Sequence, residues 1–101
     1  MAGVTFATIS ELDKQATGLV KVAEKPRSQL VITKRGKPVG LMRKVVGGER
    51  GRTETVSNMK NRANELLSSL ERGGSQIIIT RNGLPVVVLK KISNEAFSIK
   101  E

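Results

Sequence analysis

Apolar residues recur along this chain with the spacing of one helix face, in two separate stretches. After Ser10 they stand at positions related as i, i+4, i+7, i+8 and i+11, which are Leu12, Ala16, Leu19, Val20 and Ala23. After Ser57 the apolar positions are Met59, Ala63, Leu66, Leu67 and Leu70. This spacing predicts an amphipathic helix in each stretch, with its apolar face in a core. Serine is a favoured N-cap residue, so we expect Ser10 and Ser57 to begin the two helices.

Each predicted helix is followed by two short β-forming runs that a tight turn joins. Residues 30–33 lead through Lys34-Arg35-Gly36-Lys37 into residues 38–42, and residues 77–80 lead through Arg81-Asn82-Gly83-Leu84 into residues 85–89. Asn-Gly is a strong signal of a two-residue hairpin turn, because both residues tolerate positive φ. A short strand is also predicted before each helix, more strongly in the first half of the chain than in the second. The pattern therefore predicts the order β-α-β-β twice.

The order of elements repeats because the sequence itself repeats. Residues 8–45 align with residues 55–92 at a constant offset of 47, without a gap, and 13 of the 38 aligned pairs are identical. The repeat is too long for a solenoid turn and too short for an ordinary domain. It has the size of a protomer that works as a homodimer. We therefore expect an α+β fold in which two β-α-β-β repeats form a single-chain pseudo-dimer, with their basic hairpin tips on a common side.

Residues 1–46 are the first repeat, residues 47–53 a linker, and residues 54–101 the second repeat. The linker is predicted from its glycines and charges. Ser93 is expected to begin a short last helix over residues 94–99. A linker of this length permits pairing of the repeats within one chain or their exchange between two chains, and the sequence leaves both open.

The composition removes several classes of function. The 101 residues include no Cys and no His, so a thiol nucleophile, a zinc–thiolate site and a histidine base are all excluded. The nine carboxylates show no spacing typical of a hydrolytic pair, and we expect no enzyme, cofactor or metal site. No apolar run approaches the roughly 20 residues of a membrane span, and the first residues lack a signal peptide's features. We expect a soluble, cytoplasmic protein without a membrane partner.

The charge of the chain indicates a polyanionic partner. Eighteen Lys and Arg oppose nine Asp and Glu, which gives a net charge of +9. Neutralised phosphates release counterions and so favour binding, although a basic surface can also serve solubility alone. Phe6 and Phe97 are the only aromatic residues. Since single-stranded bases are usually bound by stacking on aromatic side chains, duplex DNA is the better candidate.

The two hairpins share a sequence motif. Ile32-Thr33-Lys34-Arg35-Gly36-Lys37-Pro38-Val39 and Ile79-Thr80-Arg81-Asn82-Gly83-Leu84-Pro85-Val86 both read Ile-Thr-basic-X-Gly-X-Pro-Val, each after a strand and an amphipathic helix. This pattern resembles the Phd/YefM antitoxin family, once per repeat and over nearly the whole chain. The resemblance implies a dimeric domain that binds operator DNA and represses its own toxin–antitoxin operon. It also implies a flexible C-terminal segment that neutralises the toxin.

In that family the DNA contacts come mainly from a basic residue early in the helix and from basic residues at the hairpin. Carried over to this chain, the resemblance implies DNA contacts from Lys14, Lys34, Arg35, Lys37, Lys60, Arg62, Arg81 and Asn82. The early-helix position holds Lys60 in the second repeat, whereas the first repeat has Asp13 there and Lys14 beside it. The alternative interpretation of all these residues is a charged, solvated surface.

The expected function is that of an antitoxin-like DNA-binding protein, a transcriptional autorepressor of a toxin–antitoxin type operon. The alternative is a protein-interaction module that binds a toxin or a copy of itself without specific DNA binding. Only nine residues follow Ile92, too few for a long wrapping segment at about 3.3–3.6 Å per residue. The sequence leaves open whether a cognate toxin exists and whether two pseudo-dimers associate further.

Overall fold

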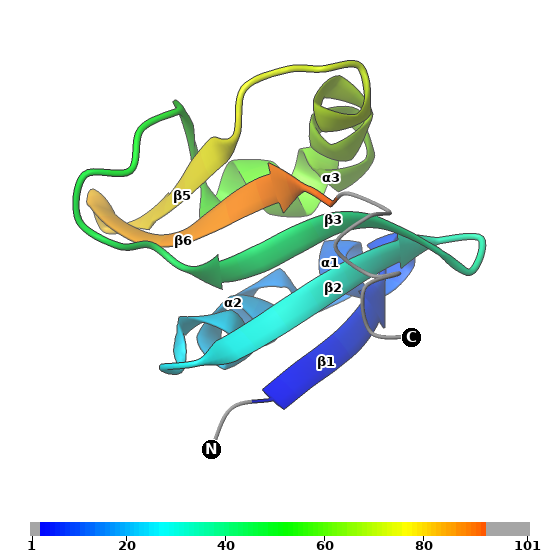
Figure 1. The fold of residues 1–101 in the computed structure, drawn as a ribbon, viewed down its shortest axis with the longest axis horizontal. Helices are drawn as coiled ribbons and strands as arrows, with labels where there is room; N and C mark the ends of the chain where they lie inside the picture. Colours follow the sequence, from blue (N-terminus) through cyan, green and yellow to red (C-terminus); the bar gives the residue numbers. More distant parts are fainter. Residues whose placement is uncertain (1–2, 93–101) are drawn as a thin grey trace.

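The computed structural model describes residues 3–92, which form an α+β fold with a six-stranded mixed sheet and three helices on one face of it (Figure 1). The predicted α+β class is therefore confirmed. The predicted helix over residues 94–99 lies outside the described residues. The elements are β1 (Gly3–Thr8), α1 (Ile9–Lys14), α2 (Ala16–Glu24), β2 (Ser28–Lys34), β3 (Lys37–Lys44), β4 (Arg52–Thr55), α3 (Val56–Glu71), β5 (Ile77–Arg81) and β6 (Leu84–Lys91).

The strand order is β1-β2-β3-β6-β5-β4, so the hairpin of each half lies inside and the first strand of each half lies at an edge. β1 pairs with β2 and β4 with β5 in parallel, whereas β3 and β6 pair antiparallel at the centre. In that central pair Met42 lies opposite Leu89, its equivalent 47 residues on. The pairs Gly40–Lys91 and Lys44–Val87 exchange with one another when the two halves are interchanged. Strand order and central register are thus both unchanged by that interchange.

Backbone geometry is repeated along with the sequence. Thr8, the residue before α1, has φ −83 and ψ 164, and Thr55, the residue before α3, has φ −83 and ψ 162. Gly36 and Gly83, in the two hairpin turns, have φ 81 and φ 80. The residues before them also have positive φ, with 53 at Arg35 and 55 in the second turn. Positive φ at both central residues is the type I′ pattern, so both predicted hairpins and their tight turns are confirmed.

The predicted helix starts at Ser10 and Ser57 are wrong. The hydroxyl of Thr8 accepts the Glu11 N–H at 3.0 Å, and the Glu11 carboxylate accepts the Thr8 N–H at 2.9 Å. This reciprocal arrangement is a capping box, for which Thr-X-X-Glu is a known signature. In the second half Thr55 accepts the Asn58 N–H at 3.0 Å. Each helix therefore begins directly after its preceding strand, one residue before the serine, and its cap lies two residues before the serine.

The first predicted helix is not continuous. It divides at Gln15, which has φ −127 and ψ 35, into α1 and α2. α3 has the same departure at Arg62, with φ −131 and ψ 25, and Arg62 is the equivalent of Gln15. Neither position is a proline or glycine, the residues that usually signal a break. The apolar spacing gave no sign of it either, because residues on both sides of the break still face the sheet.

The core lies between the helices and one face of the sheet. The predicted apolar stripes of both helices are confirmed, because all of their residues are buried except Leu19, which is half-buried and packs against the core. α3 packs closely on the sheet at Gly40, since a Cβ added there would lie 2.6 Å from Cδ2 of Leu67. The strand residues of this core cluster are Ala7, Leu30, Ile32, Val39, Met42, Ile77, Ile79, Val87 and Leu89.

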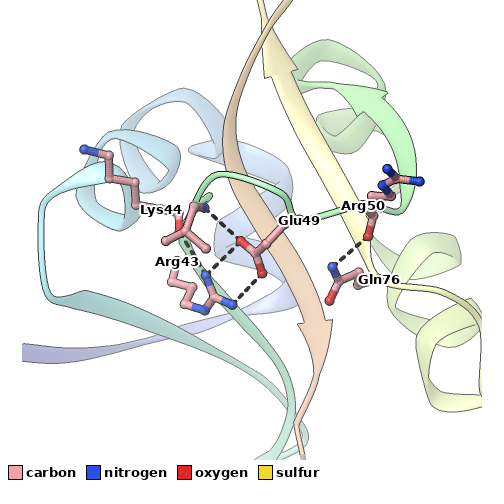
Figure 2. A network of polar contacts seen from close by, with 6 residues as sticks. Arg43, Lys44, Glu49, Arg50 and Gln76 are labelled. Atoms are coloured by element: carbon pink, nitrogen blue, oxygen red, sulfur yellow. Dashed lines mark hydrogen bonds and ion pairs between the residues drawn. The ribbon is translucent and has the colours of Figure 1, made fainter.

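The predicted linker crosses β6 on the face of the sheet away from the helices, as Figure 2 shows. Glu49 fixes it there, since Nη1 and Nη2 of Arg43 donate to its carboxylate at 3.0 and 2.6 Å and the Val46 N–H donates at 2.9 Å. Nε2 of Gln76 donates to the Arg50 carbonyl at 2.7 Å. β4 then begins at Arg52, so the last two residues of the predicted linker already belong to a strand. The linker is thus bonded to both halves of the sheet.

Candidate nucleic-acid interface

A hollow of about 450 Å³ lies where α1, α3 and the first hairpin meet. Two of the predicted DNA-contacting residues, Lys34 and Arg62, line it together. Asp13 from α1 and Glu65 from α3 face the same hollow. The fold therefore brings a helix position of the first half, a hairpin residue of the first half and helix residues of the second half into one surface. The full lining is Ile9, Ser10, Asp13, Lys34, Asn61, Arg62, Ala63, Asn64 and Glu65.

Arg62 is held by carboxylates of its own half. Its Nε lies 2.7 Å from Oε1 of Glu65, and its Nη1 lies 3.7 Å from Oε2 of Glu54. The hydrogen bond to Glu65 and the negative charges of both carboxylates raise the pKa of the Arg62 guanidinium. Glu54 is almost fully buried and also pairs with Arg52 at 2.9 Å. A phosphate would compete with two carboxylates for Arg62.

Arg81 is also engaged, and by the other half of the chain. Its Nη1 and Nη2 each donate to an oxygen of Glu24, at the end of α2, at 2.8 Å. This two-pronged pairing is the strongest geometry between a guanidinium and a carboxylate. The hydrogen bond from Arg81 to Glu24 raises the pKa of the guanidinium. Among residues 3–92, the equivalent residues Lys34 and Glu71 form no ion pair with each other.

The remaining predicted residues are exposed or half-exposed. Lys14, Arg35, Lys37, Lys60 and Asn82 are exposed, and Lys34 is intermediate. Within the described part of the chain none of the five cations in this group forms an ion pair. Their charge is thus available to an external anion, unlike that of the two arginines described above.

The two hairpin tips point away from each other at opposite ends of the long axis of the molecule (Figure 1), so the expectation that the basic tips lie on a common side is wrong. The Cα extent along this axis is 40 Å. One turn of B-DNA advances by about 34–36 Å, the distance between equivalent half-sites. The extent of the whole molecule along this axis is therefore slightly more than one helical turn of duplex.

Sequence reasoning missed the carboxylates that hold the two arginines. Glu65 follows Arg62 by three residues on a helix, a spacing that brings side chains together, so this pair had a sequence signal. Glu24 and Arg81 are 57 residues apart, and only the pairing of the two halves brings them together. No local signal could have indicated that contact.

No protein-family model matches the chain, and neither a curated protein nor a solved structure does. The resemblance to the Phd/YefM antitoxins therefore stays a prediction from the sequence. In residues 3–92 no helix is long and apolar enough to cross a membrane.

Proposed function

We propose that the chain is an antitoxin-like DNA-binding protein whose two halves act as a pseudo-dimer, and that it represses its own toxin–antitoxin type operon. The observation that carries the proposal is the central register. β3 and β6 pair about Met42 and Leu89, and this register supports a two-fold arrangement of the halves within one chain. A duplex with two half-sites is the ligand that such symmetry fits best.

The free cations supply the binding energy in this proposal. Lys34, Arg35 and Lys37 at one hairpin tip contact phosphates, as does Lys60 on α3, while polar side chains of the two helices face base edges. Arg81 and Arg62 contribute less, because Glu24 and the carboxylates around Arg62 already neutralise them. The surplus positive charge of the chain adds a long-range attraction for DNA that salt weakens.

The test is a titration by fluorescence anisotropy against a fragment of the chain's own promoter and against a scrambled duplex of equal length. Each duplex is titrated at several salt concentrations, because affinity without the salt dependence is uninterpretable. We expect tighter binding to the promoter at every salt concentration. Equal affinity for both duplexes throughout would remove the claim of a specific regulator.

Charge-reversal variants then locate the surface. Lys60→Glu and Lys37→Glu each remove an exposed, unpaired cation, and each should weaken binding about tenfold or more and reduce the salt slope by about 1. Arg50→Glu is the matched control, since Arg50 is exposed on the linker that crosses the face of the sheet away from the helices (Figure 2). Equal losses in all three variants would indicate net charge rather than a defined site.

The second candidate is a protein-interaction module without specific DNA binding. The outermost strand β1 favours it, because Val4 is 55% exposed there and Gly3–Thr8 carries no charged residue. Uncharged edge strands are common places of strand addition between proteins. Co-purification of the product of a neighbouring gene, together with loss of that product in Val4→Lys, would support this candidate.

A further inference from the structure

The two halves carry opposite charge at equivalent helix positions. Asp13 on α1 aligns with Lys60 on α3, and Lys14 aligns with Asn61. Together with Glu11, these residues give α1 a net charge of −1, whereas the first six residues of α3 have a net charge of +1. Both Asp13 and Lys60 are exposed, and neither forms an ion pair within residues 3–92. The difference is therefore presented to solvent and is not cancelled by a neighbour.

At the hairpin tips it is the first half that carries more positive charge. The first tip carries three cations, Lys34, Arg35 and Lys37, and none of them is paired in the described residues. The second tip carries one cation, Arg81, which Glu24 holds with two hydrogen bonds of 2.8 Å. Positive charge is thus concentrated at the hairpin in the first half and on the helix in the second.

α1 and the first hairpin contribute to one surface, because Asp13 and Lys34 line the same hollow. A phosphate bound by Lys34 in this hollow is repelled by the carboxylate of Asp13. The position equivalent to Asp13 is Lys60 in the second half, and the position equivalent to Asn61 is Lys14 in the first half; both lysines attract phosphate and can donate to bases. The two ends therefore offer unlike chemistry to a duplex that spans them.

We propose that this protein binds duplex DNA in one fixed orientation, on an operator whose two half-sites differ in sequence. This inference rests on the proposed function and names its specificity. Asp13 accepts a hydrogen bond from the amino group of cytosine, whereas Lys60 donates to O6 and N7 of guanine, at equivalent places in the two half-sites. Asp13 and Lys60 are then the residues that tell the half-sites apart, and a perfect palindrome is a poorer ligand than a pair of unlike halves.

The first test is selection of binding sites from random-sequence duplexes with the full chain. We expect an enriched motif of two unequal halves about one helical turn apart. Asp13→Lys makes the first helix match the second at this position, so its selected motif should gain guanine in the first half-site and become more palindromic. Its affinity for a palindrome built from the Lys60 half-site should rise about tenfold. Lys60→Asp is the matched control and should lower that affinity.

The second test measures orientation directly. The chain has no cysteine, so Leu84→Cys at the second hairpin tip provides a single attachment point for an iron chelate that cleaves nearby DNA. Leu84 is 66% exposed, so the label does not disturb the core. In one fixed orientation, cleavage of the selected duplex falls in one half-site only.

The outcomes separate the proposed function, specific DNA binding, from the inference that binding occurs in one fixed orientation. Unequal halves with cleavage in one half-site support the inference. A palindromic motif for the unmodified chain, or equal cleavage in both half-sites, overturns it and leaves specific DNA binding intact. No enriched motif at all overturns the proposed function and the inference together. Circular dichroism of Asp13→Lys and Lys60→Asp shows whether each variant is folded, and the cleavage test needs neither.

Discussion

Carboxylates decide which cations of this protein can meet a ligand. Arg62 and Arg81 looked equivalent to the lysines in sequence, but their guanidinium groups are bonded to Glu65 and Glu24. Lys60 has no such partner within residues 3–92. The sequence could indicate the first pairing from its i, i+3 spacing but not the second, which depends on how the halves meet. The sequence thus shows which residues are cations, but it does not show which of these cations are already paired with a carboxylate in the fold.

The ionised Glu49 carboxylate makes the stability of the fold depend on pH. The side-chain hydrogen bonds from Arg43, and then the backbone N–H of Val46, lower the pKa of the Glu49 carboxyl below its ordinary value of 4.5. A lowered pKa means that the folded state favours the ionised carboxylate. Its contribution to stability is therefore fully present above about pH 4.5 and is lost as the pH falls through the lower folded value.

Glu49→Gln should lower the free energy of unfolding by about 1–3 kcal/mol at pH 7, because Arg43 loses its charged partner. The deficit should shrink as the pH falls below 4.5. Urea unfolding at a series of pH values measures both effects. Glu71→Gln, which removes an exposed carboxylate without an ion pair in residues 3–92, is the matched control at pH 7. A deficit of equal size at every pH would contradict the assigned role of Glu49.

Among the elements, the apolar spacing and the turn chemistry were sufficient to predict both hairpins and both helix stripes. Gly36 and Gly83 have the positive φ that the turns require. The helix starts were mispredicted, because Thr8 and Thr55 compete with serine as caps and only Thr8 has a glutamate three residues on. The break at Gln15 was missed because no proline or glycine marks it and the apolar face continues across it.

The packing of the helices on the sheet differs between the two halves. Gly40 on β3 lies under Leu67 on α3, whereas their equivalents across the molecule are Val87 and Val20. A small strand residue thus faces a large helix residue on one side, and two valines stand at the equivalent positions on the other. This exchange of volume indicates that the halves fit each other better than each would fit a copy of itself.

Gly40→Ala should lower the free energy of unfolding by about 1–3 kcal/mol, because the added methyl group would overlap Leu67. In the background of Leu67→Val, which shortens the facing side chain, the same change should cost markedly less. A double-mutant cycle measured by urea unfolding gives the coupling between the two positions. Strictly additive effects would show that this contact does not set the packing.

For the whole molecule, the repeat in the sequence predicted two halves of like local structure, and caps, turns and helix departures do recur 47 residues apart. The order of strands across the middle of the sheet was not predictable, since the sequence left exchange between chains open. The linker connects the halves through Arg43, Glu49 and Gln76, and it favours pairing within one chain. The two hairpin tips lie at opposite ends of the long axis, and the repeat alone gave no sign of this arrangement (Figure 1).

Native mass spectrometry of the chain with its own promoter duplex is the most direct measurement of the central claim, because it counts chains per duplex. If both half-sites are read by the two halves of one chain, the specific complex contains one chain and one duplex. The same duplex with one half-site scrambled should still bind one chain, but more weakly. A specific complex with two chains per duplex would mean that each chain reads one half-site, and it would contradict the single-chain account.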